Sequence, residues 1–280
     1  MHRRCVAVLC VALVALVAAV TLGSVPKRLN GIGPMAEASA RQLSASSSQS
    51  GLIFNGARIG AFLLNQSAPG AVVEVPDPAG SGQTVFKMTV GDGDVYPITP
   101  TDDPRAELLS PPKVLPGHQY WWRAKFLLPA NFPSSVPGWL TVLEGPYGHP
   151  SNGTPPWHLE INRNHIQWSR NRSYSWDVPW RMPLVQGKWI KVLVHFRFAQ
   201  HGFVEMWIDG HRVTFFRRKT YNPLGVVPTR RLRMMTRDPS NDGGANSVTI
   251  LNYRMAGMFP SVTIYEGQTK LGTTRASVAE

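Results

Sequence analysis

The sequence predicts an all-β protein, a two-sheet antiparallel sandwich or jelly roll. From Gly51 onward, short runs of alternating apolar and polar residues recur, and Gly, Pro and Asn separate them. No segment has the 3.6-residue period of an amphipathic helix. Many short strands at this spacing are typical of sandwiches and jelly rolls. About 230 residues are enough for one such domain, so we predict a single domain over 51–280.

The alternation predicts strands throughout this domain. They are 71–75, 84–90, 105–109, 119–128, 139–144, 157–162, 165–170, 189–198, 203–208, 211–217, 231–236, 247–254 and 261–266. The clearest has one face made of Ile190, Val192, Val194, Phe196 and Phe198. That face must be core, because five large apolar side chains in register would otherwise meet water.

The opposite face of the same strand is mixed, as in a groove that handles a sugar. It carries Trp189, Lys191, Leu193, His195 and Arg197. The segment "WHLEINRNHIQW" behaves alike and presents apolar residues on one side. Its other side presents His158, Glu160, His165 and Gln167. From these polar faces we select His158, Lys191 and Arg197 as candidate substrate-binding residues.

A hairpin is predicted where "HGFVEMWIDGHRVTFFRRKTY" turns at Asp209-Gly210, because this pair tolerates the positive φ of a tight primed turn. Its second strand ends among cations and aromatic rings. The candidate substrate-binding residues there are Arg217, Arg218, Lys219 and Tyr221. Aromatic rings stack on sugar faces while cations meet carboxylate or sulfate. The alternative is a solvated basic edge that discourages strand-to-strand aggregation.

The N-terminus resembles a secretory signal, with Arg3 and Arg4 ahead of an apolar run over 5–22. We predict a signal peptide over 1–22, with a cleavage site near residue 40, and a Ser/Ala/Gly-rich flexible linker over 23–50. An uncleaved membrane anchor is the alternative. The protein is therefore expected to be secreted. Both cysteines fall inside the apolar run, which excludes thiol nucleophiles, zinc-thiolate sites and disulfides from the mature chain.

The charge is strongly positive, at +12, and unevenly spread. The window 160–237 holds 15 basic and 4 acidic residues, so it carries +11 by itself. Such a concentration favours a polyanionic partner. Export and the absence of a Lys/Arg tail argue against nucleic acid, and an acidic polysaccharide suits the compartment better. We expect a monomer with no stable membrane insertion after signal cleavage.

Four motifs resemble the heparin-lyase-I-like polysaccharide lyases, relatives of alginate and glucuronan lyases with a concanavalin-like β-jelly roll. In order they are "DDPRAELLSP", "GHQYWWRAKFLLPANFP", "GKWIKVLVHFRFAQHGFVEMWIDG" and "NYRMAGMFPSVTIYEGQTKLGTT", and they span about 85–278. The resemblance implies β-elimination on a uronate-containing polysaccharide. That reaction needs a neutralised carboxylate, a base for the C5 proton and an acid for the leaving oxygen.

The resemblance also implies individual roles. Arg105 matches the family's arginine in "RAEL", whose planar guanidinium would bind the uronate carboxylate. The alternative for Arg105 is a pair with Glu107, two residues on and therefore on the same face. His195, on the polar face of its strand, is a further catalytic candidate, although a histidine there is often structural.

Two catalytic motifs depart from the family. Where the family has Gln-x-His, this chain has Glu144 with no histidine two residues later, and Tyr147 and His149 in the following loop are the candidate substitutes. In "YRMAGMF", Tyr253 keeps the first aromatic position, but Phe259 stands where the catalytic tyrosine belongs. Phenylalanine cannot exchange a proton.

Cofactors are not required by this reading, although the loops around Asp92-Gly93-Asp94 and 238–244 contain enough oxygen atoms to suggest structural Ca²⁺. Turn chemistry explains the same residues equally well. Two other functions stay open beside the lyase. One is a non-catalytic acidic-glycan-binding jelly roll that lost its proton-transfer residues. The other is a glycoside hydrolase of similar fold, although the laminarinase-type Glu-x-Asp-x-x-Glu run is absent.

Overall fold

The computed structural model describes residues 50–100, 102–147, 154–171, 176–218, 226–237, 244–257 and 261–279. The predicted signal peptide and nearly all of the predicted linker lie outside this part. Within it, no helix is both long enough and apolar enough to cross a membrane.

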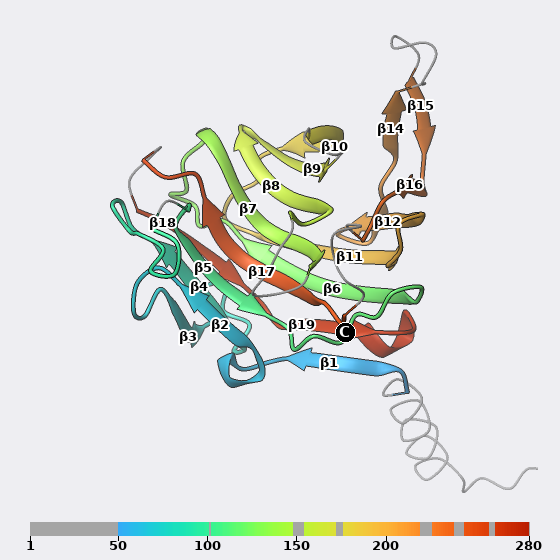
Figure 1. Ribbon diagram of the computed structural model, residues 1–280. Coiled ribbons are helices and arrows are strands. Elements are labelled where there is room, and N and C mark those ends of the chain that lie inside the picture. The colour runs from blue at the N-terminus through green and yellow to red at the C-terminus, as the bar shows by residue number, and fades with distance from the viewer. Residues whose placement is uncertain are drawn as a thin grey trace, which may run out of the picture. The chain divides into compact units, whose positions relative to one another are not determined.

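Two antiparallel sheets make up the domain (Figure 1). Sheet A follows the order β13 (His211–Arg212), β12 (Gly202–Ile208), β11 (Trp189–Arg197), β6 (Gln119–Leu127), β18 (Val262–Glu266), β4 (Thr84–Val90) and β3 (Val72–Pro76). Three further strands join it at the side, β1 (Leu52–Gly56), β16 (Leu232–Met234) and β19 (Thr269–Gly272).

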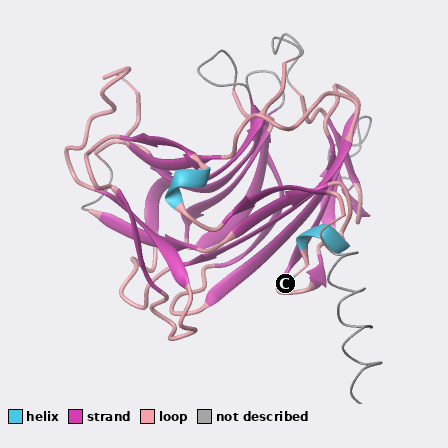
Figure 2. Cartoon of the chain, turned by 90° about the horizontal axis from the view of Figure 1, so that it is seen from below, coloured by secondary structure: helices cyan, strands magenta, loops and turns pink. Residues whose placement is uncertain are grey.

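Sheet B follows the order β10 (Trp176–Pro183), β9 (His165–Asn171), β8 (Trp157–Arg163), β7 (Val136–Tyr147), β17 (Ser247–Arg254), β5 (Arg105–Leu109) and β2 (Leu63–Gln66). The helices of the described part are two single 3-10 turns, η1 (Ile59–Ala61) and η2 (Ala276–Val278) (Figure 2). The predicted all-β jelly roll is therefore confirmed.

The core lies between the two sheets and is built by alternation. The apolar face predicted for the 189–198 strand is fully buried, and so are the apolar residues of "WHLEINRNHIQW". Trp157 and Trp168 stack with ring centroids 4.2 Å apart, and Trp122 of sheet A lies 5.7 Å from Trp157 of sheet B. Because every second residue of these strands is committed to the core, the residues between them must face outward.

Every strand that the sequence predicts is present, but one is divided. The Asp209-Gly210 turn has φ angles of 49° and 82°, as a primed hairpin turn requires. The strand after it then ends at Arg212. The chain leaves sheet A, and β14 (Phe215–Arg218) pairs with β15 (Val226–Thr229) as a separate hairpin that projects beyond β16 (Figure 1).

Five strands escaped prediction: β1, β2, β10, β15 and β19. Most of them are short and lie at or near a sheet edge, where exposure on several sides removes the regular apolar alternation. In β10, exposed and half-buried residues dominate.

A β-bulge in β7 sets which side chains face outward from sheet B. Thr141 lies opposite Glu160 and Glu144 opposite His158, so four residues of β7 span three residues of β8. The extra residue changes the alternation, and both Thr141 and Glu144 therefore lie on the outer face. Bulges of this kind re-aim side chains beside functional sites.

Candidate active site

A cavity of about 790 Å³ opens on the outer face of sheet B. Strands β5, β7, β8, β9, β10 and β17 form its floor and sides, and the loop before β5 closes one end. Its titratable lining residues are Tyr96, Asp102, Arg105, Glu144, Tyr147, His158, Glu160 and Tyr253. The sequence-predicted candidates Arg105, Glu144, Tyr147, His158 and Tyr253 thus come together from four strands.

Arg105 lies at the floor of this groove, with only 11% of its side chain exposed. Its guanidinium forms an ion pair with Asp102, and its Nη1 lies 3.6 Å from Glu107 Oε1. The Glu107 pair considered from the sequence is therefore present, and Arg105 nevertheless lines the groove. Burial alone would lower the pKa of Arg105, but Glu107, Tyr253, Asp102 and Tyr96 together outweigh burial and raise it. Arg105 is a fixed cation.

Two tyrosine rings hold the guanidinium plane of Arg105 in place. Its Cζ lies 4.2 Å from the ring centre of Tyr96 and 4.3 Å from that of Tyr253. Tyr253 in turn donates its hydroxyl to Asp102 Oδ1 at 3.2 Å. Burial is the main reason why the pKa of Tyr253 is raised, and Arg105 opposes that shift. Tyr253 therefore holds its proton and can act as an acid.

Glu107 lies beneath the groove and is almost fully buried. Asn65 donates its side-chain amide to Glu107 Oε2 at 2.7 Å. Burial raises the pKa of Glu107 to about 7, while Arg105 and Asn65 pull it down. A carboxyl that titrates near neutrality beside Arg105 makes the charge of this end of the groove depend on pH.

His158 lies at the centre of a second polar group. Its Nε2 is 3.4 Å from Glu144 Oε1, and its Nδ1 is 3.9 Å from Glu160 Oε2. The ring stacks on Trp176, with centroids 4.3 Å apart. Gln167 and Ser169 donate hydrogen bonds to Glu160 Oε1 at 2.6 and 2.8 Å and so fix that carboxyl.

Burial sets the protonation of this group. It lowers the pKa of His158 to about 3, and it raises the pKa of Glu144 well above its usual value, with the charge of Glu107 adding to the increase. His158 Nε2 is buried and forms no hydrogen bond with the described residues. His158 is thus neutral at physiological pH, and Glu144 favours its neutral, hydrogen-bond-donating form.

Tyr147 completes the set at the end of β7. Its hydroxyl hydrogen-bonds to Glu144, and burial raises its pKa well above that of free tyrosine. The groove therefore contains one fixed cation, one neutral base and two protonated phenols. That combination is able to hold a carboxylate, remove a proton and deliver another.

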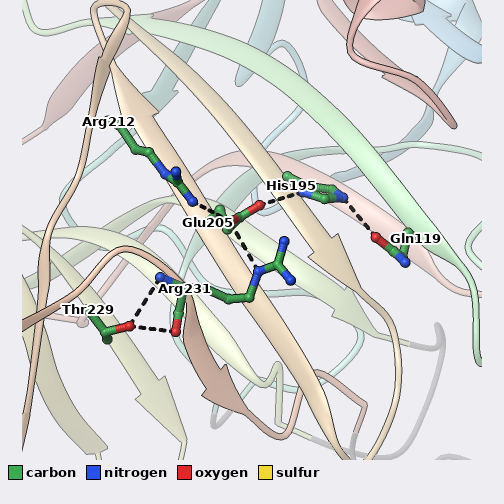
Figure 3. Close-up of polar contacts among 6 residues, drawn as sticks. All are labelled: Gln119, His195, Glu205, Arg212, Thr229 and Arg231. Atoms are coloured by element: carbon green, nitrogen blue, oxygen red, sulfur yellow. Dashed lines mark hydrogen bonds and ion pairs between the residues drawn. The ribbon is translucent and has the colours of Figure 1, made fainter.

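Three predicted candidates lie elsewhere. His195, Lys191 and Arg197 are on the outer face of sheet A, because the 189–198 strand is β11 of that sheet. His195 Nδ1 contacts Glu205 Oε2 at 2.7 Å (Figure 3). The His195 ring also stacks on Trp121, with ring centroids 4.1 Å apart. The sequence could identify the polar face of this strand but not the sheet to which it belongs. The groove is built without these residues.

The remaining candidates are placed in part or not at all. Arg217 and Arg218 belong to β14 of the projecting hairpin. Lys219, Tyr221, His149 and Phe259 lie outside the described residues, as does most of the 238–244 loop.

The other loop predicted to hold Ca²⁺ is the one around Asp92-Gly93-Asp94. There Asp94 Oδ2 accepts a hydrogen bond from the backbone N–H of Gly91 at 2.6 Å, which is turn chemistry. Within the described part of the chain, no group of three or more His, Cys, Asp or Glu residues is arranged to hold a metal ion. Structural Ca²⁺ stays a prediction.

Several groove residues were not singled out from the sequence as candidates for the site. They are Asn65, Tyr96, Asp102, Trp139 and Trp176. Asp102 stands three residues before Arg105 in the "DDPRAELLSP" motif, so its spacing was a usable signal. Asn65 reaches Glu107 from 42 residues earlier in the chain, and Tyr96 reaches Arg105 from the loop before β5. Nothing local to either residue indicates the contact.

The chain is similar to known polysaccharide lyases in sequence or in fold. A family model described as polysaccharide lyase matches residues 45–235. The structure is similar to an endo-β-1,4-glucuronan lyase from the fungus Trichoderma reesei, with a TM-score of 0.59, 17% identity, and coverage of 81% of this chain and 97% of that one. It is also similar to alginate lyase A1-II′, a member of polysaccharide lyase family 7, with a TM-score of 0.53, 10% identity, and coverage of 77% and 96%. At these identities the structural likeness shows the jelly-roll fold alone. No curated protein matches the sequence.

Proposed function

Because the chain belongs to the polysaccharide lyase family, we propose that it is an exported enzyme that cleaves a uronate-containing acidic polysaccharide by β-elimination in the groove of sheet B. The family membership supports a polysaccharide partner. The uronate and the reaction are supported by the residues gathered in the groove, and export by the apolar N-terminal run.

The first requirement of the reaction is to neutralise the substrate carboxylate. Arg105 does this with its guanidinium, which is fixed between Tyr96 and Tyr253. Glu144 in its neutral form donates a second hydrogen bond, as an amide would. Withdrawal of charge from the carboxylate makes the C5–H bond acidic.

The second requirement is a pair of proton carriers. His158 takes the C5 proton with its neutral imidazole, which lines the groove. The electron pair released from that bond forms the C4–C5 double bond and expels the glycosidic oxygen from C4. Tyr253 donates the proton that this oxygen needs, with Tyr147 as the second phenol within the same groove.

One observation carries the proposal: a largely buried, neutral histidine and a fixed arginine line the same polysaccharide-sized groove. Its test is incubation of the purified domain with a panel of acidic polysaccharides that includes polyglucuronate, alginate and heparin. Ultraviolet-absorbing unsaturated uronate ends should accumulate on at least one of them. Reducing ends that form without unsaturation would instead indicate a glycoside hydrolase.

The second candidate function is a binding module that holds the glycan without cleaving it. The observation in its favour is that Arg105 already pairs with Asp102 and Glu107, so a substrate carboxylate must compete with two resident carboxyl groups. Retention of the protein on a polysaccharide that never acquires unsaturated ends would establish this alternative.

A further inference from the structure

The outer face of sheet A carries two adjoining hollows of about 350 and 310 Å³, on the side of the sandwich away from the groove. They share Arg123 and Lys191 in their linings. Five cationic side chains line the two hollows, against two carboxylates. The cations are Arg123, Lys125, Lys191, Lys270 and Arg275, and the carboxylates are Asp77 and Asp209.

The pairing of the strands places like charges side by side. Lys191 of β11 lies directly opposite Lys125 of β6, and Arg123 of β6 lies directly opposite Lys270 of β19. Like charges directly opposite one another destabilise a sheet. Four cations therefore lie on three adjacent strands, and an anion bound across them would be attracted to all four.

The two carboxylates of these hollows are engaged in local structure. Asp77 accepts hydrogen bonds from the Ala79 backbone N–H at 2.8 Å and from Trp189 Nε1 at 2.9 Å. Asp209 Oδ1 accepts the backbone N–H of Lys191 at 2.9 Å. They hold a turn and a strand end in place and leave the surface with an excess of positive charge.

The neighbouring part of the same sheet shows what a compensated cluster looks like. There Glu205 lies between Arg212 and Arg231 and also binds His195, so one carboxylate serves two guanidinium groups (Figure 3). The two hollows have a different composition, because their linings hold five cations and two carboxylates.

Aromatic rings lie beside two of these cations. Lys125 Nζ lies 4.5 Å from the ring centre of Trp189, and Arg275 Cζ lies 5.2 Å from that of Trp207. Trp189 lines one hollow and Trp207 the other. An indole ring offers a flat apolar surface to a sugar, while adjacent cations bind its carboxylate or sulfate.

We propose that these two hollows form a second, non-catalytic site for an acidic polysaccharide chain, on the face of the sandwich opposite the groove. The inference rests on the proposed function for the chemistry of its ligand but not for catalysis, because the hollows contain no pair of proton carriers. The site would retain a long polymer while the groove works on one stretch of it.

The test uses Lys191→Glu, since Lys191 lines both hollows, and Lys113→Glu as the matched control at an exposed lysine outside them. Each is made in an Arg105→Ala background, which weakens the groove. We expect Lys191→Glu to weaken binding of polyglucuronate and heparin about tenfold, because a charge-assisted contact becomes a repulsion, and Lys113→Glu to change it less than about twofold. Equal losses in both variants, or none, would overturn the proposal.

Two further arms keep the outcome decisive. Lys191→Gln, which removes the charge and keeps a polar side chain, should give a smaller loss in the same direction if Lys191→Glu folds poorly. Duplex DNA and vesicles containing phosphatidylserine are measured at the same salt concentration, and tighter binding to either would overturn the assignment to polysaccharide.

Turnover of short acidic oligosaccharides should be unchanged by Lys191→Glu when Arg105 is intact. Lys191-dependent binding without lyase activity would refute the proposed function alone, and lyase activity with Lys191-independent polymer binding would refute this inference alone.

Discussion

The two outer faces of the sandwich differ in the types of ionisable group that they carry and in the burial of those groups. The groove of sheet B collects three carboxyls, Asp102, Glu144 and Glu160, around a single arginine, and most of these side chains are buried. The hollows of sheet A collect cations on a more open surface. Burial shifts protonation, whereas exposed charge acts over distance and is screened by salt.

In the proposed function, the net charge of +12 serves binding of the polymer and not the reaction. Most cations of the basic window 160–237 lie away from the groove. They belong to β11 and the segments near it, and to the projecting β14–β15 hairpin. The groove needs neutral groups beside Arg105, and it obtains them by desolvation. Chemistry and retention of the polymer are thus assigned to opposite faces.

The largest effect is expected at the proton carriers. His158→Asn removes the base, and Tyr253→Phe removes one phenol and little else, so each should lower turnover by about 10² to 10⁴ while binding of the polymer persists. Steady-state rates of unsaturated-end formation measure the effect. Phe203→Leu, on the outer face of sheet A, serves as the control that should retain turnover. A His158→Asn enzyme with normal turnover would remove the groove from the chemistry.

Glu144 should set the upper pH limit of activity. Its carboxyl can lie beside a uronate only in the neutral form, and burial raises its pKa well above the usual value. Activity should therefore fall as the pH rises through that pKa. Glu144→Gln donates a hydrogen bond without a titrating proton, so its activity should extend to higher pH than that of the unmodified protein. Identical pH profiles would contradict this role.

Stability should also depend on pH through Glu107. Its pKa is about 4.5 in the unfolded chain and about 7 in the folded protein, so the folded state binds more protons between those values. The stabilisation is complete below pH 4.5 and is lost as the pH rises towards 7, on the order of 3 kcal/mol.

Glu107→Gln keeps a hydrogen-bond acceptor for Asn65 and should flatten this dependence, as followed by urea unfolding at several pH values. Glu266→Gln is the matched variant on sheet A, because Glu266 is fully buried in β18 and burial raises its pKa as well. Both variants should flatten the stability profile, and the Glu266 variant should leave turnover alone. An unchanged profile for Glu107→Gln would show that this carboxyl is ionised throughout.

The smallest effect concerns salt. Binding of a long acidic polymer should weaken as salt is added, because exposed charges are screened over about 8 Å at physiological ionic strength. Turnover of short oligosaccharides, which depends on the buried groove, should respond less. A salt dependence that is equal for polymer and oligosaccharide would mean that one face performs both tasks.

The sequence predicts those structural features that are marked by a local pattern of residues. Alternation along β11 fixed which side of the strand enters the core, and the Asp209-Gly210 pair fixed the turn. Alternation cannot say which of the two sheets a strand joins, so Lys191, His195 and Arg197 were grouped with Arg105. Whether a strand faces the groove depends on long-range pairing, which leaves no periodic trace.

The candidate site also combines residues that local motifs mark with features that depend on long-range contacts. Arg105, Glu144 and Tyr253 could be found because motifs mark them. His158 could be placed on a polar face, but its protonation comes from burial beneath Trp176, which no spacing reveals. The β7 bulge that turns Glu144 towards His158 was equally hidden, because one extra residue in a strand has no signature in an isolated sequence.

The most direct test of the central claim is the rate of unsaturated-end formation by Arg105→Lys beside Arg105→Ala, on whichever acidic polysaccharide the unmodified protein cleaves. Lysine keeps the charge but loses the planar pair of donors and the stacking between Tyr96 and Tyr253. The account predicts that both variants lose at least about 10² in turnover and that both are still retained by the polymer through sheet A. Near-normal turnover by Arg105→Lys, with normal stability, would contradict the claim that Arg105 binds the uronate in this groove.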